Sequence, residues 1–213
     1  MVANCAMNRE RQLAGVNSYA RELRFDPLAY LESRLASRPA GEKPAWLDLC
    51  CGSGRALRQA SARLGGKAEL VGVDLVGYFD RASAGQAESP RLVVASVETW
   101  VPDGAFDLIT CVHGLHYVGD KLAVLARAAT WLAPDGLFIA DLDLRSIRVP
   151  GGQAAHRQLA TELRAAGFTY NARRHQISRT GPGQLSLPYT YLGADDRAGP
   201  GYTGQPAVDS HYR

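Results

Sequence analysis

The sequence is poor in the features that mark disulfide-rich, zinc-binding, membrane or secreted proteins. Four cysteines occur among its 213 residues, and no two of them form a C-x-x-C pair. Neither a disulfide framework nor a zinc site is therefore indicated. No apolar run approaches the roughly 18 residues that a membrane helix needs, and the stretch from Met1 to Gln12 lacks the apolar core of a signal peptide. We expect a cytoplasmic protein with reduced thiols and no membrane partner.

An excess of one charge is also missing, because 24 Lys and Arg residues face 21 Asp and Glu residues, for a net charge of +3. Nucleic-acid-binding proteins usually concentrate far more positive charge on one face. No Asn/Asp-Pro-Pro-Tyr/Phe motif appears either, so we expect no nucleic-acid partner. Hydrophobic residues make up 46% of the chain, which is enough for the core of one globular domain. The basic residues are nearly all arginine, a bias that indicates GC-rich codon usage.

Apolar, strand-like stretches alternate with helix-like ones along most of the chain. Asp26-Pro27 is a typical helix start, and further helices are predicted at 55–64, from Leu122 to Leu132, and from Leu159 to Ala166. Near-continuous apolar strands separated by helices are typical of a parallel sheet covered on both faces. The predicted strands are Ala45–Cys50, Glu69–Leu75, Arg91–Ala95, Phe106–Cys111 and Leu137–Leu142.

The pattern changes after Gly167. Apolar and polar residues alternate from Phe168 to Ala172 and again from Leu185 to Tyr191, on either side of the turn residues 180–183. This pattern predicts an antiparallel hairpin at one edge of the sheet. The last 20 residues, 194–213, are polar and rich in Gly and Pro, which favours a flexible tail. Tyr202 and Tyr212 leave a lid as the alternative.

A glycine-rich turn, Asp48-Leu49-Cys50-Cys51-Gly52-Ser53-Gly54, follows the first predicted strand. Ligands of open α/β sheets bind beyond the carboxyl ends of the strands, and small residues let a ligand approach the backbone. Asp74 ends the second strand, where a carboxylate can accept hydrogen bonds from a ribose. A G-x-G-x-x-G dinucleotide motif is not complete, because Leu57 stands at its last position.

The segment WLDLCCGSG resembles the first motif of class I (Rossmann-like) S-adenosylmethionine (SAM)-dependent methyltransferases, with Cys50 in place of the first glycine. GVDL, VVASVETWVPDGAFDLITCVHGLHYV and LARAATWLAPDGLFIADLD resemble later motifs of the same family. In the last of these, Asp135 replaces a glycine. The resemblance covers about 150 residues, from Ala45 to roughly Ala194.

The resemblance implies an α/β fold: a doubly wound, mostly parallel seven-stranded sheet with helices on both faces and a C-terminal antiparallel hairpin strand. It divides the chain into an N-terminal helical cap segment (1–44), a SAM-binding domain (45–193) and a C-terminal tail (194–213). It implies SAM as cofactor and S-adenosylhomocysteine (SAH) as product. Ser96 stands where most members carry an aspartate, so adenine would rest on the Val97 backbone with Ser96 or Glu98. The implied cofactor-binding residues are Asp48, Cys50, Gly52, Ser53, Gly54, Asp74, Leu75, Ser96, Val97, Glu98 and Cys111.

Three residues are candidates for catalysis. His113 and His116 follow the fourth strand, where the resemblance places the methyl donor, and a neutral imidazole suits proton removal. For His113, a base and a loop-packing residue are equally open. For His116, ordering of the loop is favoured. Tyr19 could contact the methionine part of SAM, although packing of an amphipathic helix is favoured.

Asp141 and Asp143 follow the fifth strand and could hold Mg²⁺ with a catechol. Such a site also needs an acidic residue after the fourth strand, where Val112 and His113 stand instead, so we expect no metal. The expected function is methyl transfer from SAM to N or O of a small molecule, in specialised metabolism. The alternatives are a peptide or protein methyltransferase, a non-catalytic SAM-binding partner, and an NAD-dependent oxidoreductase. Few residues remain to select an acceptor, so either the N-terminal helices and the tail cover it or a homodimer completes the pocket.

Overall fold

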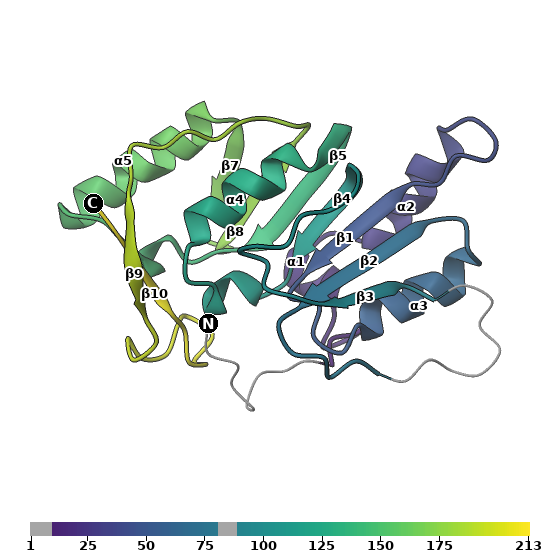
Figure 1. Ribbon diagram of the computed structural model, residues 1–213, viewed down its shortest axis with the longest axis horizontal. Helices are drawn as coiled ribbons and strands as arrows, with labels where there is room; N and C mark the ends of the chain where they lie inside the picture. Colours follow the sequence, from purple (N-terminus) through teal and green to yellow (C-terminus); the bar gives the residue numbers. More distant parts are fainter. Residues whose placement is uncertain (1–9, 81–88) are drawn as a thin grey trace.

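The computed structural model describes residues 10–80 and 89–213. Cys5 and the first nine residues of the predicted cap segment lie outside these ranges. A seven-stranded sheet in the order β3-β2-β1-β4-β5-β8-β7 forms the centre of the described part (Figure 1). The first five strands of this order are parallel, and β8 is antiparallel to both of its neighbours. The seven strands of this sheet are β1 (Ala45–Leu49), β2 (Glu69–Asp74), β3 (Arg91–Val94), β4 (Phe106–Cys111), β5 (Leu132–Asp141), β7 (Phe168–Asn171) and β8 (Gln176–Thr180). The predicted fold class is confirmed.

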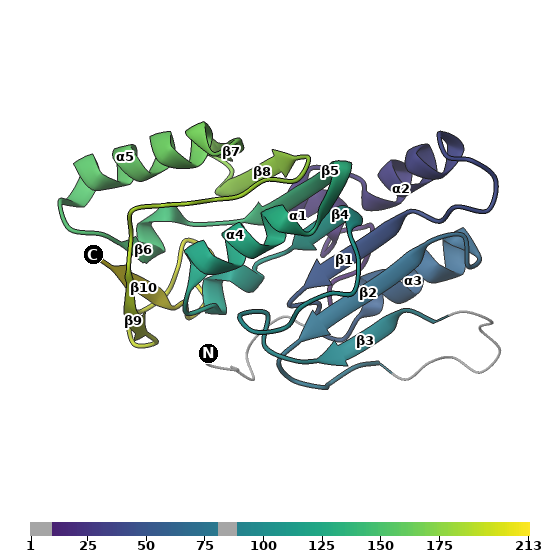
Figure 2. The ribbon, with the colours of Figure 1, turned by 45° about the horizontal axis from the view of Figure 1, so that its top comes forward.

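Helices cover both faces of this sheet (Figures 1 and 2). Successive residues of a strand point to opposite faces, so Trp46 and Leu47 of β1 belong to two different cores. Trp46 packs with side chains of α1 (Tyr19–Leu23), α2 (Pro27–Ala36) and α3 (Arg55–Leu64). Leu47 belongs to the core that contains side chains of α4 (Lys121–Thr130) and α5 (Gly152–Ala165). The central strands β1 and β4 are therefore buried on both faces, and the carboxyl ends of β1, β2 and β4 lie along one edge.

The helix starts and ends follow from local chemistry. The Asp26 side chain accepts hydrogen bonds from the backbone N–H groups of Leu28 (2.9 Å) and Ala29 (3.2 Å), as predicted for an N-cap; such a cap is worth about 1 kcal/mol. Helix α3 has the predicted bounds and ends at Gly65, whose φ of 55° is left-handed. The Asp26 cap and the left-handed glycine each act within one turn of helix. Both can therefore be predicted from the sequence without the tertiary structure.

The boundary between α4 and β5 differs from the prediction. Helix α4 ends at Thr130, and Leu132 already belongs to β5, where it pairs with Phe106 of β4. The register then shifts, so that Leu108 pairs with Leu137. The turn-like residues 134–136 are absorbed in this bulge. The predicted helix was therefore too long and the predicted strand began too late.

The edge hairpin also pairs differently from the prediction. Strand β7 pairs with β8, in a register that aligns Phe168 with Arg179, and not with the stretch from Leu185 to Tyr191. The segment of β8 contains one buried apolar residue, Ile177, among polar ones. A strand with so little apolar alternation gives no clear signal in the sequence.

The C-terminal segment is not the flexible tail that its composition favours. It contributes two strands to a second, three-stranded sheet in the order β6-β10-β9 (Figure 1). Strand β10 (Asp209–Tyr212) lies between β6 (Ile147–Arg148) and β9 (Tyr191–Asp195). Because β9 starts at Tyr191, it crosses the domain boundary predicted at residue 193.

A buried lysine fastens this segment to α4. Lys121 is fully buried, and its Nζ donates hydrogen bonds to the carbonyl oxygens of Val118 (3.0 Å) and Val208 (2.7 Å) and to the Ser210 hydroxyl (2.9 Å). Burial lowers the pKa of Lys121 to about 8. The Tyr212 hydroxyl adds a second link, because it donates to Asp120 at 2.9 Å. The C-terminal strand is thus tied to the first turn of α4 by polar groups.

We expect Lys121→Ala to lower the free energy of unfolding by roughly 2–4 kcal/mol, because it leaves two buried carbonyl groups and a hydroxyl without their donor. Hydrogen exchange should become faster in β10 in the same variant. Lys67→Ala, at an exposed position, is the control and should change neither quantity. Unchanged stability and unchanged exchange in Lys121→Ala would show that the lysine does not fasten the tail.

Within the described ranges, no helix combines the length and the apolar character required to cross a membrane.

Candidate active site

The glycine-rich turn lies at the carboxyl ends of β1 and β2 and is held there by Asp74. The backbone N–H of Cys51 donates to the carbonyl of Val73 at 3.1 Å. The N–H groups of Gly52 and Val76 donate to the two carboxylate oxygens of Asp74, at 2.9 and 3.0 Å. Asp74 therefore links the turn after β1 to the loop after β2. The structure brings these predicted residues together.

Left-handed backbone explains why glycine suits this turn. Gly52 and Gly54 have φ values of 60° and 74°, and Cys50, which replaces the first glycine of the motif, has φ 58°. A residue with a Cβ atom pays roughly 1–2 kcal/mol in this conformation. The family motif has glycine at position 50 because the backbone there is left-handed. Cys50 adopts the same conformation at the cost of backbone strain.

Exposed apolar side chains lie on the loop after Asp74 and on the neighbouring strand β3. Leu75 is 36% exposed, Val94 60% and Tyr78 70%, and Val94 pairs with Asp74 across β2 and β3. A carboxylate next to apolar surface at the strand ends suits a nucleoside, since the acid can bind the ribose hydroxyls while apolar groups cover the base. This donor set fits SAM.

The residues predicted to contact adenine follow β3, and they differ in how free their side chains are to bind a ligand. The Ser96 hydroxyl accepts a hydrogen bond from the backbone N–H of Glu98 at 3.3 Å. The Glu98 carboxylate accepts one from the N–H of Asp120 at 2.8 Å, so it is engaged at the start of α4. Val97 is almost fully buried. The geometry favours Ser96 over Glu98 for contact with a base.

Asp48 and Tyr19 lie beneath the turn and bind each other. The carboxylate of Asp48 is fully buried and accepts hydrogen bonds from the Tyr19 hydroxyl and from Thr110 Oγ1, both at 2.6 Å. Burial raises the pKa of Asp48 to about 7, although the two hydrogen bonds oppose this shift. Tyr19 itself is 3% exposed. This geometry favours a positioning role for both, which for Tyr19 agrees with the packing role that the sequence favoured, whereas the resemblance implied direct cofactor binding for Asp48.

The thiols after β1 and β4 pack against a glycine of the following loop. A Cβ atom added to Gly114 would lie 2.7 Å from Cys111 Sγ and 2.8 Å from Cys50 Sγ. The hydrogen bond with Cys50 and burial both raise the pKa of the Cys111 thiol, so Cys111 remains neutral. Cys111 is fully buried and helps bring the loop that carries His113 close to the glycine-rich turn.

His113 forms a pair with a carboxylate that the sequence did not single out. Its Nε2 lies 3.0 Å from Glu22 Oε2, and its backbone N–H donates to Asp141 at 3.2 Å. Burial tends to raise the pKa of Glu22, but the hydrogen bond and charge of His113, together with Arg11, lower it overall. Within the described ranges, His113 Nδ1 is buried without a hydrogen-bond partner. Glu22 lies one helical turn after Tyr19, which is its only sequence signal.

His116 lies in a cluster of rings that includes the C-terminal tail. Its ring is 5.3 Å from the ring of His113 and 5.2 Å from that of Tyr202. Tyr202 stacks on His175 at 4.0 Å, with an angle of 10° between the rings. His116 is 5% exposed, and neither of its ring nitrogens has a hydrogen-bond partner in the described part of the chain. His175 carried no sequence signal, whereas Tyr202 was noted as a tail tyrosine.

The buried state of His116 should appear in the pH dependence of stability. Burial lowers the pKa of His116 to about 3, from 6.5. Between these values the unfolded chain binds a proton that the native protein does not, so this residue lowers stability as the pH falls from about 6.5. Its contribution is up to about 1.4 kcal/mol per pH unit.

We therefore expect the free energy of unfolding of the wild type to fall relative to that of His116→Gln between pH 7 and pH 5. Urea unfolding at pH 7, 6 and 5 measures it. A constant difference between the two proteins across these pH values would contradict the buried, neutral state of His116.

The two carboxylates after β5 are engaged with neighbouring groups. Asp141 is 2% exposed and binds the backbone of His113. Asp143 accepts from the N–H of Arg145 at 3.0 Å and caps the short helix η2 (Leu144–Ser146). Among the residues that the structure describes, no group of three or more His, Cys, Asp or Glu side chains could hold a metal ion.

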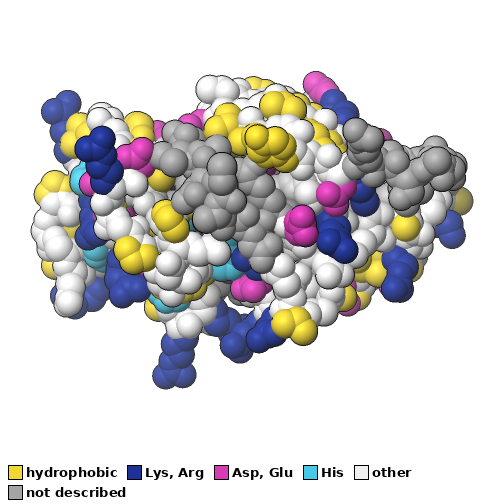
Figure 3. Space-filling view, turned by 90° about the horizontal axis from the view of Figure 1, so that it is seen from below, with side chains coloured by type: hydrophobic (Ala, Val, Ile, Leu, Met, Phe, Trp, Pro, Cys, Tyr) yellow, Lys and Arg dark blue, Asp and Glu magenta, His cyan; other side chains and the backbone are white. Residues whose placement is uncertain are grey.

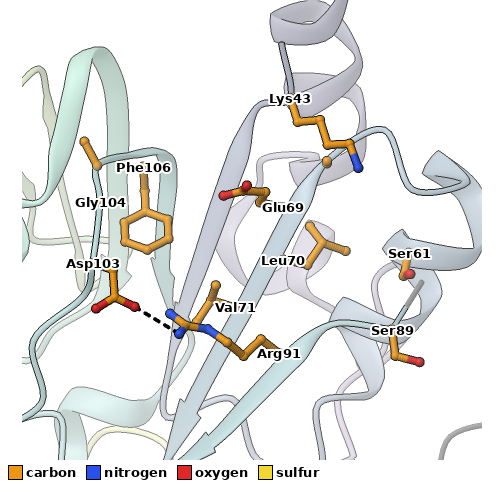
Figure 4. A pocket seen from close by; sticks show the side chains of 12 residues that line it. Lys43, Ser61, Glu69, Leu70, Val71, Ser89, Arg91, Asp103, Gly104 and Phe106 are labelled. Atoms are coloured by element: carbon orange, nitrogen blue, oxygen red, sulfur yellow. Dashed lines mark hydrogen bonds and ion pairs between the residues drawn. The ribbon is translucent and has the colours of Figure 1, made fainter. Parts of the chain in front are cut away.

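Two cavities lie at opposite ends of the strands. One of about 330 Å³ is lined by His116, Asp143 and Tyr202, on the side of the carboxyl ends. A larger one of about 550 Å³, shown in Figure 4, is lined by Glu69 and Arg91, the first residues of β2 and β3. Ligands of this fold bind at the carboxyl ends of the strands. The smaller cavity, beside His116, is therefore the better candidate for a ligand site, although the other cavity is larger. In the space-filling view of Figure 3, histidine side chains lie among Lys and Arg side chains toward the left of the molecule.

A doubly wound sheet with a glycine-rich turn after β1 and an acid at the end of β2 defines a Rossmann-like nucleotide-binding domain. Residues 18–179 match a protein family described as "Methyltransferase domain". The chain belongs to this family, and the resemblance to class I SAM-dependent methyltransferases is confirmed, with SAM as the cofactor.

The curated relatives are similar over part of their length. The nocamycin O-methyltransferase of Saccharothrix syringae is 35% identical over 96 residues, covering 42% of this chain and 34% of the relative. The ubiquinone biosynthesis O-methyltransferase of Xanthomonas axonopodis pv. citri (strain 306) is 36% identical over 123 residues, covering 54% and 48%. This chain thus spans about a third to a half of the relatives' length.

Among solved structures, the plantazolicin methyltransferase BpumL in complex with a triazolic desmethylPZN analog and SAH has a TM-score of 0.46 and 17% identity, over 60% of this chain and 50% of that one. The amino pentose methyltransferase CalS10 from Micromonospora echinaspora, with SAM bound, has a TM-score of 0.40 and 23% identity, over 55% and 49%.

Proposed function

We propose that the protein transfers the methyl group of SAM to an oxygen or nitrogen atom of a small molecule. The observation that carries this proposal is the Asp74 carboxylate, which holds the glycine-rich turn at the strand ends next to exposed apolar side chains. The names of the two curated relatives support an oxygen acceptor in particular. A role in specialised metabolism rests on the nocamycin relative and on the arginine bias of the sequence.

When bound, SAM supplies a methyl group on a positively charged sulfur, which is a good leaving group. The protein then has to align the acceptor and exclude water. Asp74 binds the ribose hydroxyls, Leu75 and Ser96 contact the adenine side, and the turn from Cys50 to Gly54 approaches the rest of the cofactor. Asp48 and Tyr19 fix this turn from below.

His113 takes the proton of the acceptor. Glu22 accepts the hydrogen bond of Nε2–H and so sets the tautomer, which leaves the lone pair of Nδ1 as the basic site. The 3.0 Å contact supports this assignment, and a ring that only packs the loop does not need it. Asp141 holds the backbone of the same residue, so the ring is fixed from two sides.

The test is production of SAH from SAM, measured by mass spectrometry with three panels of acceptors: hydroxylated small molecules, small amines and short peptides. We expect turnover with one of the small-molecule panels, at the same rate with and without a metal chelator. Turnover with peptides alone would favour the peptide methyltransferase. Tight SAM binding without turnover on any panel would favour the non-catalytic partner. A rate that falls on addition of the chelator would contradict the metal-free reaction.

Completion of the pocket by a second copy of the chain stays a prediction, which light scattering tests directly. The division into a cap segment (1–44), a SAM-binding domain (45–193) and a tail (194–213) is likewise proposed. Helices α1 and α2 pack on the same face of the sheet as α3, which supports the cap as part of one folded unit.

A further inference from the structure

The cavity beside His116 lies between residues that follow the central sheet and residues of the C-terminal segment. The sheet side contributes His116, Asp143 and Arg148, and the C-terminal segment contributes Tyr202, Ala207 and Asp209. Its volume of about 330 Å³ lies at the lower end of the range for small-molecule sites. It is therefore suited to a compact ligand.

The wall from the C-terminal segment is fixed by specific hydrogen bonds. The N–H of Val208 donates to the carbonyl of His116 at 2.8 Å, and the Tyr117 hydroxyl donates to Gln205 Oε1 at 3.1 Å. The N–H of Gly201 donates to the carbonyl of Gln205 at 2.8 Å and closes the loop that carries Tyr202. These contacts hold the loop against the residues that follow β4, next to the site described above.

The cavity is polar but balanced in charge. Two ion pairs line it, Asp143 with Arg145 at 3.2 Å and Asp209 with Arg148 at 2.5 Å. Paired charges offer hydrogen-bond donors and acceptors without a net field, which disfavours a strongly charged ligand. The polar groups equally disfavour an apolar ligand, since its burial would cost them their water.

His116, which lines this cavity, has buried polar atoms that lack a partner among the described residues. The residue is 95% buried, and within the described ranges neither ring nitrogen forms a hydrogen bond. This is unusual, because buried polar atoms normally have partners. A neutral imidazole offers one donor and one acceptor, and a hydroxyl group can serve either. The ring of His113 is 5.3 Å from that of His116, so the proposed base adjoins this wall of the cavity.

We propose that the cavity between His116 and the loop from Ala198 to Ala207 is the acceptor site, and that it takes a compact, net-neutral molecule bearing a hydroxyl group that hydrogen-bonds to His116. This inference rests on the proposed methyl transfer. It assigns specificity to the C-terminal segment, and it makes His116 a residue that orients the acceptor while His113 removes the proton.

Calorimetry on the SAH-saturated protein tests the proposal with defined probes. The neutral hydroxylated probes are catechol and methyl α-glucopyranoside, the charged ones are benzoate and benzylamine, and the apolar one is toluene. We expect at least one neutral hydroxylated probe to bind more tightly than the others and to shift the His116 ring signals in NMR spectra, assigned by their loss in His116→Gln. Preference for a charged or apolar probe, or binding without a shift at His116, would overturn the proposal.

Variants then place the probe. Ala198→Trp, in the cavity lining, should weaken binding of that probe at least tenfold, as should His116→Phe. The matched control Ala194→Trp, on β9 outside the lining, should not. Unchanged affinity in both cavity variants would overturn the assignment. SAH binding should be the same in all of these proteins. Intact SAH binding without binding of a neutral hydroxylated probe refutes the acceptor site alone, whereas absence of SAH binding in the wild type refutes the proposed function itself.

Discussion

Asp74→Ala should lower the affinity for SAM by at least roughly 100-fold. The carboxylate is expected to accept hydrogen bonds from the ribose, and bonds to a charged group are worth about 1.5–3 kcal/mol each. The same side chain holds the N–H groups of Gly52 and Val76, so its loss also loosens the turn. Calorimetry with SAM and SAH measures the effect.

Two variants make this result interpretable. Asp74→Asn keeps one acceptor oxygen and should bind SAM with intermediate affinity. Asp103→Ala removes a carboxylate that is paired with Arg91 near the opposite ends of the strands, and it should bind SAM as the wild type does. Wild-type affinity in Asp74→Ala would refute the ribose assignment.

His113→Ala should lower kcat by about 10²–10⁴-fold, the usual range for loss of a general base, and leave the SAM affinity nearly unchanged. Removal of the base affects the transition state, whereas the donor is held by the turn and Asp74. Steady-state kinetics with the acceptor found in the panels, together with calorimetry, separates the two quantities.

Glu22→Gln should lower kcat roughly tenfold, because an amide can donate as well as accept a hydrogen bond and so no longer fixes the tautomer of the His113 ring. His211→Ala, an exposed histidine on β10, is the control and should leave kcat unchanged. If His113→Ala loses SAM affinity and turnover to the same extent, the ring packs the loop and is not the base.

The parallel half of the sheet could be predicted because its signals are local. Strand β4 and helix α3 have the predicted bounds: every residue of β4 is buried, and α3 ends at a glycine. The turn and Asp74 were found for the same reason, since the turn directly follows one apolar strand and Asp74 ends the next. Fold class and the donor side of the site therefore follow from short stretches of sequence.

The rest depends on contacts between distant segments. Glu22 lies 91 positions from His113 in the sequence, so no spacing rule pairs them. Tyr202 reaches His175 and His116 because Lys121 and Tyr212 hold the C-terminal strand on α4. The composition of residues 194–213 favours a flexible tail. In the sequence, nothing distinguishes the polar side chains that hold this segment in place from polar side chains exposed to solvent, because the difference is their burial in the folded protein.

The turn from Cys50 to Gly54 and the Asp74 carboxylate are expected to bind SAM. Calorimetry of the wild-type protein with SAM, SAH and NAD tests this binding most directly. We expect SAM and SAH each to bind at one site per chain and NAD not to bind. Tight binding of NAD without binding of SAM or SAH would contradict this expectation.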